Sequence, residues 1–253
     1  MSARRFFVEG LRAAGSVVDI TGGDARKIVA VLRLRAGDRI ELVDSGGTLF
    51  DAALSIDDGR VQATLTAVLP AEPASNAKPL RVDVAQALPK GQKMDFVVEK
   101  TAELGVETIV PFSSERSIAA GVGSAKLERW RRLAKTASQQ SGRRTVARIE
   151  DPVAFDRLLE RFSAYDVVLF PWELAPRVPL RDRLPLLLQS ACTALVVVGP
   201  EGGFSHDEAG TAVARGAEML WLGPRILRTE TAAMALLAII GAFADTEVRV
   251  SSS

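Results

Sequence analysis

Hydrophobic and polar residues alternate in short runs over the first part of the chain. The runs RIELVDSG, TLFDAALSI and RVQATLTAVL lie between residues 39 and 69 and are separated by turns rich in glycine and aspartate. Alternation with a period of two is typical of strands that bury one face. This spacing predicts a small antiparallel β-barrel over residues 6–69.

The pattern changes at PAEPASNAKP, which ends at residue 79. This stretch is rich in proline, alanine and serine and has little to bury, so it predicts a linker. We therefore expect one domain over residues 1–70, a linker over 71–79 and a second domain over 80–253.

In the second domain, short apolar runs alternate with longer amphipathic segments. The runs LRVDVAQAL, TIVPF, DVVLF, ALVVVG and EMLWLG are strand-like. Helices are expected at about 92–104 and 125–140, the second capped by Ser124, and around FDRLLERF, LRDRLPLLLQ and DEAGTAVARG. Strands alternating with helices predict an α/β fold on a mostly parallel sheet.

One strand, VVVG, continues directly into the turn GPEGG and then into a helix start, FSHDE. Gly202 and Gly203 allow positive φ and a close approach of the main chain to a ligand, and Ser205 and Glu208 have the spacing of a capping box. Ligands of open α/β sheets bind at the carboxyl ends of strands, so we expect this turn to hold a ligand. A purely structural turn is the alternative.

This turn matches neither the dinucleotide fingerprint nor a phosphate-binding loop. Glu201 would place negative charge beside a phosphate, so a ligand with positive charge fits better. The next residue of interest, His206, is expected on the first exposed turn of the helix.

A second segment, WLGPRILRTETAAMALLAII, has a similar organisation. A strand runs into a turn at residues 222–224, an irregular stretch ends at Arg228, and a helix follows that either Thr229 or Thr231 can cap. The helix is apolar on nearly every face, which predicts burial on all sides.

Composition narrows the class of protein. The 253 residues are 47% apolar and carry 32 basic against 31 acidic side chains, a formal net charge of +1. One cysteine allows no internal disulfide, and one histidine excludes Cys/His zinc sites, so no metal is expected. Without a signal-like or membrane-spanning stretch, we expect a soluble cytoplasmic protein with no membrane partner.

Basic residues are nevertheless concentrated in two places, residues 1–40 and 126–148. Arginine outnumbers lysine in both, as suits bidentate contacts to phosphates, so these clusters predict RNA binding. Solvated helix faces are the alternative.

The pair GPEGG and ILRTETA is the most specific signature of the chain. Together with RRFFV, VLRLRAGDRIELVDSGG, QALPKGQKMDFVVEKTAELGV, PFSSERS and QQSGRRTVARI, it resembles the RsmE family in the SPOUT superfamily of S-adenosylmethionine-dependent RNA methyltransferases. The resemblance implies a SPOUT-type knotted α/β domain with a C-terminal trefoil knot and a small N-terminal PUA-like β-barrel that binds RNA. It also implies a homodimer that methylates N3 of a uridine in 16S ribosomal RNA, within the small ribosomal subunit.

The resemblance also assigns residues. Three loops, at Pro171–Glu173, Gly199–Gly203 and Leu222–Thr231, would bind S-adenosylmethionine. The residues assigned to this binding are Phe170, Pro171, Gly199, Pro200, Glu201, Gly202, Gly203, Leu222, Gly223, Ile226, Leu227, Arg228, Glu230 and Thr231. RNA contacts are expected from Arg4, Arg5, Lys27, Arg33, Arg35, Lys90, Lys93, Arg143 and Arg144.

Methyl transfer to a ring nitrogen needs in-line alignment and leaves negative charge on the ring oxygens when N3 loses its proton. Arg228 is the first candidate to stabilise that charge and Arg116 the second; ion pairs with Glu230 or Glu115 are the structural alternative. No general base is apparent in the sequence.

Other functions remain as alternatives. A non-catalytic RNA-binding ribosome-assembly protein needs the basic clusters and the barrel but no methyl donor. A SPOUT ribose 2′-O-methyltransferase would share the fold. A nicotinamide oxidoreductase is disfavoured because the dinucleotide fingerprint is missing.

Overall fold

The computed structural model describes residues 4–70, 80–117 and 121–246. Contacts divide the chain into two compact units, one of Met1–Ala74 with Ser138–Val146 and the other of Ser75–Ala137 with Ala147–Ser253. The expected linker at 71–79 lies outside the described residues. The segment Ser138–Val146 belongs to the first unit, which a division of the sequence at one linker does not foresee.

The first unit is built on a five-stranded sheet in the order β1-β3-β4-β5-β2. Its strands are β1 (Arg5–Phe7), β2 (Val17–Ile20), β3 (Arg39–Val43), β4 (Leu49–Asp57) and β5 (Arg60–Val68). The expectation of a wholly antiparallel sheet is wrong, because β1 pairs with β3 in parallel. The long connection from β1 to β3, through β2, α1 (Gly22–Arg26) and the π-helix η1 (Lys27–Val31), returns the chain in the same direction.

The alternating pattern sorts this sheet into a buried and an exposed face. Phe6, Leu42, Phe50 and Leu65 are fully or almost fully buried and pack in one cluster with Ile28 of η1. The turn between β4 and β5 has positive φ at Asp58 (44°) and Gly59 (80°), the conformation of a tight hairpin turn.

The second unit contains a parallel sheet in the order β12-β10-β11-β6-β7-β8, with β9 also paired to β7. The fold class expected from the alternation of strands and helices is confirmed. The strands are β6 (Arg81–Ala87), β7 (Thr108–Ser113), β8 (Arg148–Ile149), β9 (Val153–Ala154), β10 (Val167–Pro171), β11 (Thr193–Val198) and β12 (Ala217–Leu220).

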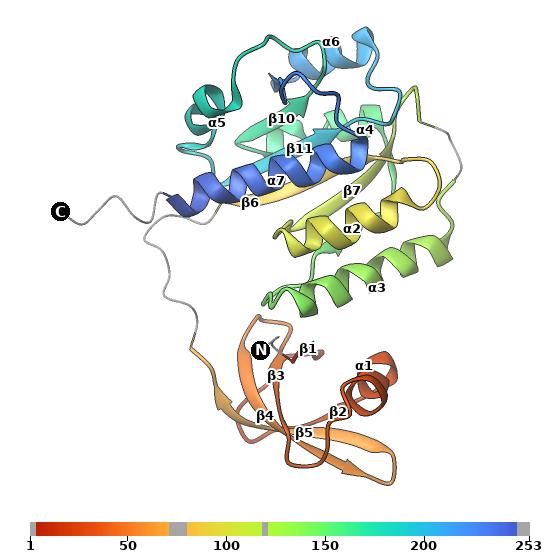
Figure 1. Ribbon diagram of the computed structural model, residues 1–253, viewed down its shortest axis with the longest axis vertical. Coiled ribbons are helices and arrows are strands. Elements are labelled where there is room, and N and C mark those ends of the chain that lie inside the picture. The colour runs from red at the N-terminus through yellow and green to blue at the C-terminus, as the bar shows by residue number, and fades with distance from the viewer. Residues whose placement is uncertain (1–3, 71–79, 118–120, 247–253) are drawn as a thin grey trace, which may run out of the picture. The chain divides into compact units, whose positions relative to one another are not determined.

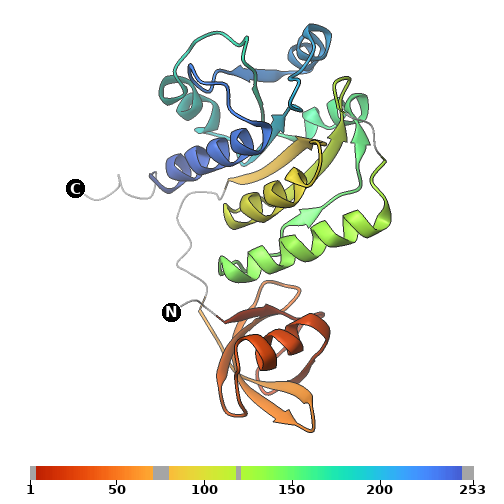
Figure 2. The same cartoon turned by 45° about the vertical axis from the view of Figure 1, so that its right-hand side comes forward.

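Helices cover both faces of this sheet (Figure 1 and Figure 2). Alternate strand residues enter different cores: Val84 and Val196 pack on one side, Ala85 and Val197 on the other. The first core includes residues of α2 (Lys93–Glu103), α3 (Ser124–Gln140), α5 (Leu180–Leu188) and α7 (Thr229–Thr246). The second includes residues of α4 (Phe155–Leu159), η2 (Phe162–Ala164) and α6 (His206–Ala214).

Helix starts agree with the sequence patterns in one case and differ in two. Ser205 caps α6 in a full capping box. Its hydroxyl accepts a hydrogen bond from the Glu208 main-chain N–H at 3.2 Å, and its own main-chain N–H donates to the Glu208 carboxylate at 3.0 Å. Ser124, in contrast, is the first residue of α3 and not its cap. Thr229 is likewise the first residue of α7, whose initial carbonyl acceptor is Arg228, and Thr231 lies inside the helix.

Helix α7 is buried on one face only, so the expectation of burial on all sides is wrong for the single chain. Ala233, Leu236 and Ile240 are buried, whereas Ala238 and Gly241 are exposed. One sheet can cover only one side of a helix, and the opposite apolar side of α7 lies open.

Candidate functional site

A pocket of about 500 Å³ opens at the carboxyl ends of β10 and β12. The two strands are parallel neighbours, with Pro171 opposite Leu220, so the loops that follow them leave the sheet side by side. Such crevices are where open α/β sheets bind ligands. The lining residues are Pro171, Trp172, Glu173, Leu174, Arg177, Trp221, Leu222, Gly223, Pro224, Arg225, Ile226, Leu227 and Ala232.

Two of the three loops expected from the sequence line this pocket. Of the residues assigned to the methyl donor, the pocket wall contains Pro171, Leu222, Gly223, Ile226 and Leu227. Phe170 is fully buried in the core, its ring 4.2 Å from that of Phe204. The wall does not include residues 199–203, Arg228, Glu230 or Thr231.

Sequence reasoning missed the wall residues that lie just outside the expected loops: Leu174, Arg177, Trp221 and Ala232. Trp221 directly follows β12, and this position after a strand end was the available signal. Trp172 meets the ring of exposed His206 edge-on at 5.5 Å. Of the charged wall residues, Glu173 and Arg225 lie within the expected loops, and Arg177 was missed.

The glycine turn after β11 packs tightly against its surroundings. A Cβ at Gly199 would lie 2.8 Å from the Phe204 ring. Gly203 has a φ of +66°, and a Cβ there would lie 2.9 Å from the Glu173 carboxylate. Gly202 does not have the positive φ that the sequence suggested. Glycine is required here because the turn folds closely onto the chain's own side chains.

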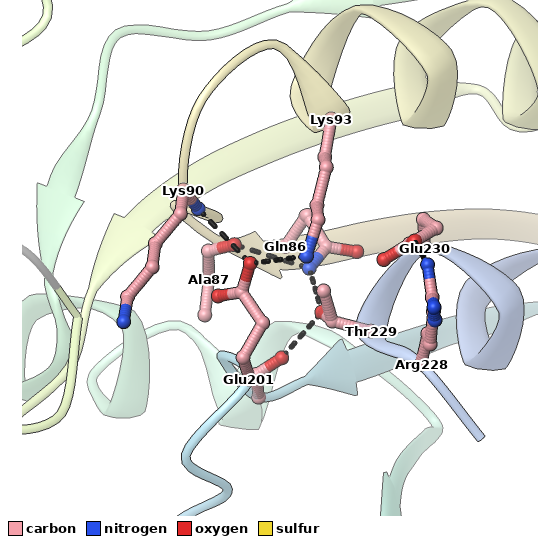
Figure 3. A network of polar contacts seen from close by, with 9 residues as sticks. Gln86, Ala87, Lys90, Lys93, Glu201, Arg228, Thr229 and Glu230 are labelled. Atoms are coloured by element: carbon pink, nitrogen blue, oxygen red, sulfur yellow. Dashed lines mark hydrogen bonds and ion pairs between the residues drawn. The ribbon is translucent and has the colours of Figure 1, made fainter.

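Glu201 is tied to the start of α2 (Figure 3). Its carboxylate accepts hydrogen bonds from Lys93 Nζ at 2.7 Å and from the Lys90 main-chain N–H at 3.1 Å. Partial burial alone would raise the pKa of Glu201, but the hydrogen bond from Lys93 and those from main-chain amides hold it below its ordinary value. Lys93 therefore supplies a positive charge beside Glu201.

A buried chain of hydrogen bonds also reaches the glycine turn (Figure 3). Gln86 Nε2 donates to Thr229 Oγ1 at 2.7 Å and to the Ala87 carbonyl at 3.1 Å, and Thr229 Oγ1 donates to the Gly199 carbonyl at 2.6 Å. Sequence reasoning assigned no role to Gln86, although this residue begins the QALPKGQ stretch quoted for the resemblance.

The two candidate catalytic arginines occupy different positions beside the turn and the pocket. Arg116 Nη1 donates to the Gly202 carbonyl at 2.9 Å. The side chain of Arg228 is 80% exposed, and its Nη1 lies 4.0 Å from Glu230 Oε1. Neither guanidinium is enclosed, so both can meet a substrate that approaches from solvent.

The residues expected to bind RNA fall into two groups. Arg5 has an 11% exposed side chain and holds Glu41 and the Gly142 carbonyl, so its role is structural. Arg144 bonds to the Pro70 carbonyl, and Lys27 lies over the Phe6 ring at 5.6 Å. Arg4, Arg33, Arg35 and Lys90 are exposed.

Two absences are relevant to the chemistry. Within residues 4–70, 80–117 and 121–246, no group of three or more His, Cys, Asp or Glu side chains could hold a metal ion. No helix in these ranges is both long enough and apolar enough to cross a bilayer.

Comparison with known proteins gives consistent results over almost the whole chain. The RNA methyltransferase domain model matches residues 76–241, and the RNA methyltransferase PUA domain model matches residues 20–66. Ribosomal RNA small subunit methyltransferase E of Bacillus subtilis is 30% identical over 246 residues, covering 94% of this chain and 95% of that protein. The protein of the same name from Synechocystis is 32% identical over 251 residues, 96% of this chain and 79% of that protein.

A solved structure agrees with these matches. The crystal structure of ribosomal RNA small subunit methyltransferase E from Neisseria gonorrhoeae, bound to S-adenosyl methionine, aligns with a TM-score of 0.82 at 30% identity. The alignment covers 95% of this chain and 97% of that one.

Proposed function

Since the chain belongs to the ribosomal RNA small subunit methyltransferase E family, we propose that it transfers a methyl group from S-adenosylmethionine to N3 of a uridine in 16S ribosomal RNA. The resemblance drawn from GPEGG and ILRTETA is confirmed by these relatives, and the SPOUT-type α/β fold with a PUA-like domain by the matching structure and domain models. The observation that carries the proposal is the pocket between the loops after β10 and β12.

The pocket fits the cofactor in size and chemistry. Its volume of about 500 Å³ lies in the range of small-molecule sites. Trp172 and Trp221 offer apolar surface for an adenine ring. Arg177 and Glu173 supply opposite charges that match the carboxylate and the ammonium of the amino-acid part. Nearby, the buried Oε2 of Glu230 has no hydrogen-bond partner among the described residues, as expected of an acceptor that awaits a donor.

When bound, S-adenosylmethionine supplies a methyl group on a positively charged sulfur, which is open to in-line attack by a nitrogen lone pair. The chain's own residues must then align the base and stabilise charge on the ring oxygens as N3 loses its proton. Arg228 follows the pocket residue Leu227 directly and is exposed, so we assign it this electrostatic role, with Arg116 as the second candidate. The proton passes to solvent.

RNA binding is proposed to involve both domains. The PUA-like domain is assigned to residues 1–70, with exposed Arg4, Arg33 and Arg35, and the methyltransferase domain to 80–253, with Lys90 near the glycine turn. We further propose that the C-terminal segment forms the trefoil knot of SPOUT proteins, that the enzyme acts in the cytoplasm, and that the substrate is RNA within the small ribosomal subunit.

We propose that the functional form is a homodimer. The open face of α7 carries Ala238, Gly241 and Ala242, small residues that allow a second helix to approach closely. A second copy of the chain would bury this face.

Calorimetry with S-adenosylmethionine, followed by mass spectrometry of nucleosides from unmodified small-subunit particles incubated with enzyme, tests the function. We expect binding and a methylated uracil base. Failure to bind the cofactor would instead support an assembly protein, and methylation of ribose would support a 2′-O-methyltransferase.

A pair of matched variants locates the binding site. Ala232→Phe places a ring in the pocket that Ala232 lines, whereas Ala214→Phe adds the same ring at the exposed end of α6. We expect only the first to abolish cofactor binding. Equal binding by both variants would place the cofactor elsewhere.

A further inference from the structure

We propose that Gln86 and Thr229 are positioning residues, which form a buried relay that sets the glycine turn against the pocket loop and thereby controls affinity for the methyl donor. This inference rests on the proposed function. It assigns a role to two residues outside the pocket wall: Gln86, which was not a candidate on sequence grounds, and Thr229, which was a candidate helix cap.

The relay joins three segments that are distant in sequence. Gln86 is the second-last residue of β6 and is 0% exposed. Thr229 is the first residue of α7 and is 5% exposed. The third member, Gly199, directly follows β11. Its carbonyl oxygen accepts a hydrogen bond from the Thr229 hydroxyl. Since the wall residue Leu227 is only two positions before Thr229, the relay sets the position of one pocket loop relative to the glycine turn.

The hydrogen bonds of the relay run in one direction only. The carbonyls of Ala87 and Gly199 accept and cannot donate, so Gln86 must present its amide NH₂ and Thr229 must give its single proton to Gly199. Donor and acceptor polarise each other along such a chain in a low-dielectric interior. A methionine at position 86 would approximate the length of glutamine but could not donate either bond.

A polar side chain at this position needs an explanation. Its neighbours Val84, Ala85 and Ala87 are buried and apolar, and burying a glutamine among them costs free energy that an aliphatic side chain would avoid. The Oε1 atom of Gln86 has no hydrogen-bond partner among the described residues, which adds to the free-energy cost of burying this side chain. The amide is therefore not explained by its contribution to packing. The two Nε2 bonds fix the start of α7 and, through it, the glycine turn.

The glycine turn is held on its other side as well. Glu201 bonds to Lys93 at the surface, and the Phe204 ring contacts Gly199 closely. The relay holds the turn on its deep side, and these contacts hold it on the other. Loss of the relay frees the deep side of the turn while the surface contacts remain.

The test compares two buried threonine hydroxyls that each donate to a main-chain carbonyl. Thr229→Val removes the relay, Thr229→Ser preserves it, and Thr101→Val removes the control bond, from Thr101 to the Val97 carbonyl at 2.7 Å within α2. The measurements are S-adenosylmethionine Kd by calorimetry, kcat and KM for methylation, and the thermal unfolding midpoint.

We expect Thr229→Val to weaken cofactor binding about tenfold, the effect of losing one buried hydrogen bond. Thr229→Ser should stay within about twofold of wild type. Thr101→Val should lower the unfolding midpoint and leave the Kd unchanged. A folded Thr229→Val protein with the wild-type Kd overturns the relay.

Gln86→Met provides an independent readout if Thr229→Val does not fold. It should weaken the cofactor Kd as Thr229→Val does, because the methionine side chain has no hydrogen to donate to Thr229. Wild-type affinity in a folded Gln86→Met protein overturns the relay. Absence of cofactor binding by the wild-type protein would overturn the proposed function itself, a result distinguishable from loss of the relay alone.

Discussion

A single carboxylate, that of Asp44, organises two loops of the first unit. It accepts hydrogen bonds from the main-chain N–H of Arg12 at 3.1 Å and from those of Gly46 and Thr48 at 2.9 Å each. Burial alone would raise the pKa of Asp44, but these amides outweigh it and hold the pKa below the ordinary value of 3.8. The ionised form therefore stabilises the folded state.

Asp44→Asn should lower the free energy of unfolding by about 1–3 kcal/mol at pH 7, because the charged acceptor of three amides is lost. The folded pKa lies below the unfolded one, so the wild-type advantage exists above the unfolded value and is lost as pH falls through the folded value. Urea unfolding at pH 7 and pH 3 measures the change. Asp57→Asn, at an exposed site, is the control. A difference between wild type and Asp44→Asn that is equal at both pH values would contradict this role.

Arg228 is the second residue whose role can be isolated. Arg228→Ala should lower kcat by about 10²–10³-fold, the usual cost of removing one stabiliser of transition-state charge. The Kd for S-adenosylmethionine should not change, because the guanidinium lies outside the pocket wall. Single-turnover methylation and calorimetry measure the two quantities, with Arg215→Ala on the exposed end of α6 as control. Normal binding with a wild-type rate would show the electrostatic role to be wrong.

At this scale, sequence reasoning succeeded where the partners are close in the chain. The capping box of Ser205 and Glu208 spans three positions and was predicted. The bond from Lys93 to Glu201 spans 108 positions, and the one from Gln86 to Thr229 spans 143, so no local pattern reveals either. Two of the three loops that the family resemblance implied line the pocket.

At the scale of elements, the long periodic segments were the predictable ones. Helices α2, α3 and α6 and five strands of the parallel sheet, β6, β7, β10, β11 and β12, appear within a few residues of the expected positions. The two-residue strands β8 and β9 were not predicted. In the first unit, β2 and the π-helix were not assigned, since both are short and η1 follows a period that neither helix nor strand patterns describe. The apolar pattern of α7 predicted burial on all sides, but the single chain buries only one face of the helix.

The exposed face of α7 leads to a prediction about assembly. Ala238→Arg should convert the proposed dimer to a monomer, because a desolvated charge without a partner is costly in an apolar interface. Val213→Arg, at a 50% exposed apolar site on α6, should leave the assembly unchanged. Sedimentation at matched concentrations distinguishes the two. A dimer that survives Ala238→Arg would mean that α7 is not the interface.

At the scale of the whole molecule, composition and pattern predicted one β-rich and one α/β domain, and both are present. They did not predict that the first unit is assembled from two separate stretches of chain. The reason is distance in sequence: Gln139 donates to Asp24, which lies 115 positions earlier. Such a contact leaves no periodic trace in either stretch.

The divided first unit has a consequence for the order of events on the ribosome. Its strands emerge early, but Arg5 and Asp24 cannot meet Gly142 and Gln139 until most of the second unit's first half has been translated. At about 5–20 residues per second, the nascent barrel waits several seconds for its last stretch. During that interval the stability of the barrel depends on its own hydrophobic core. The contacts that complete the first unit form only after part of the second unit has been synthesised.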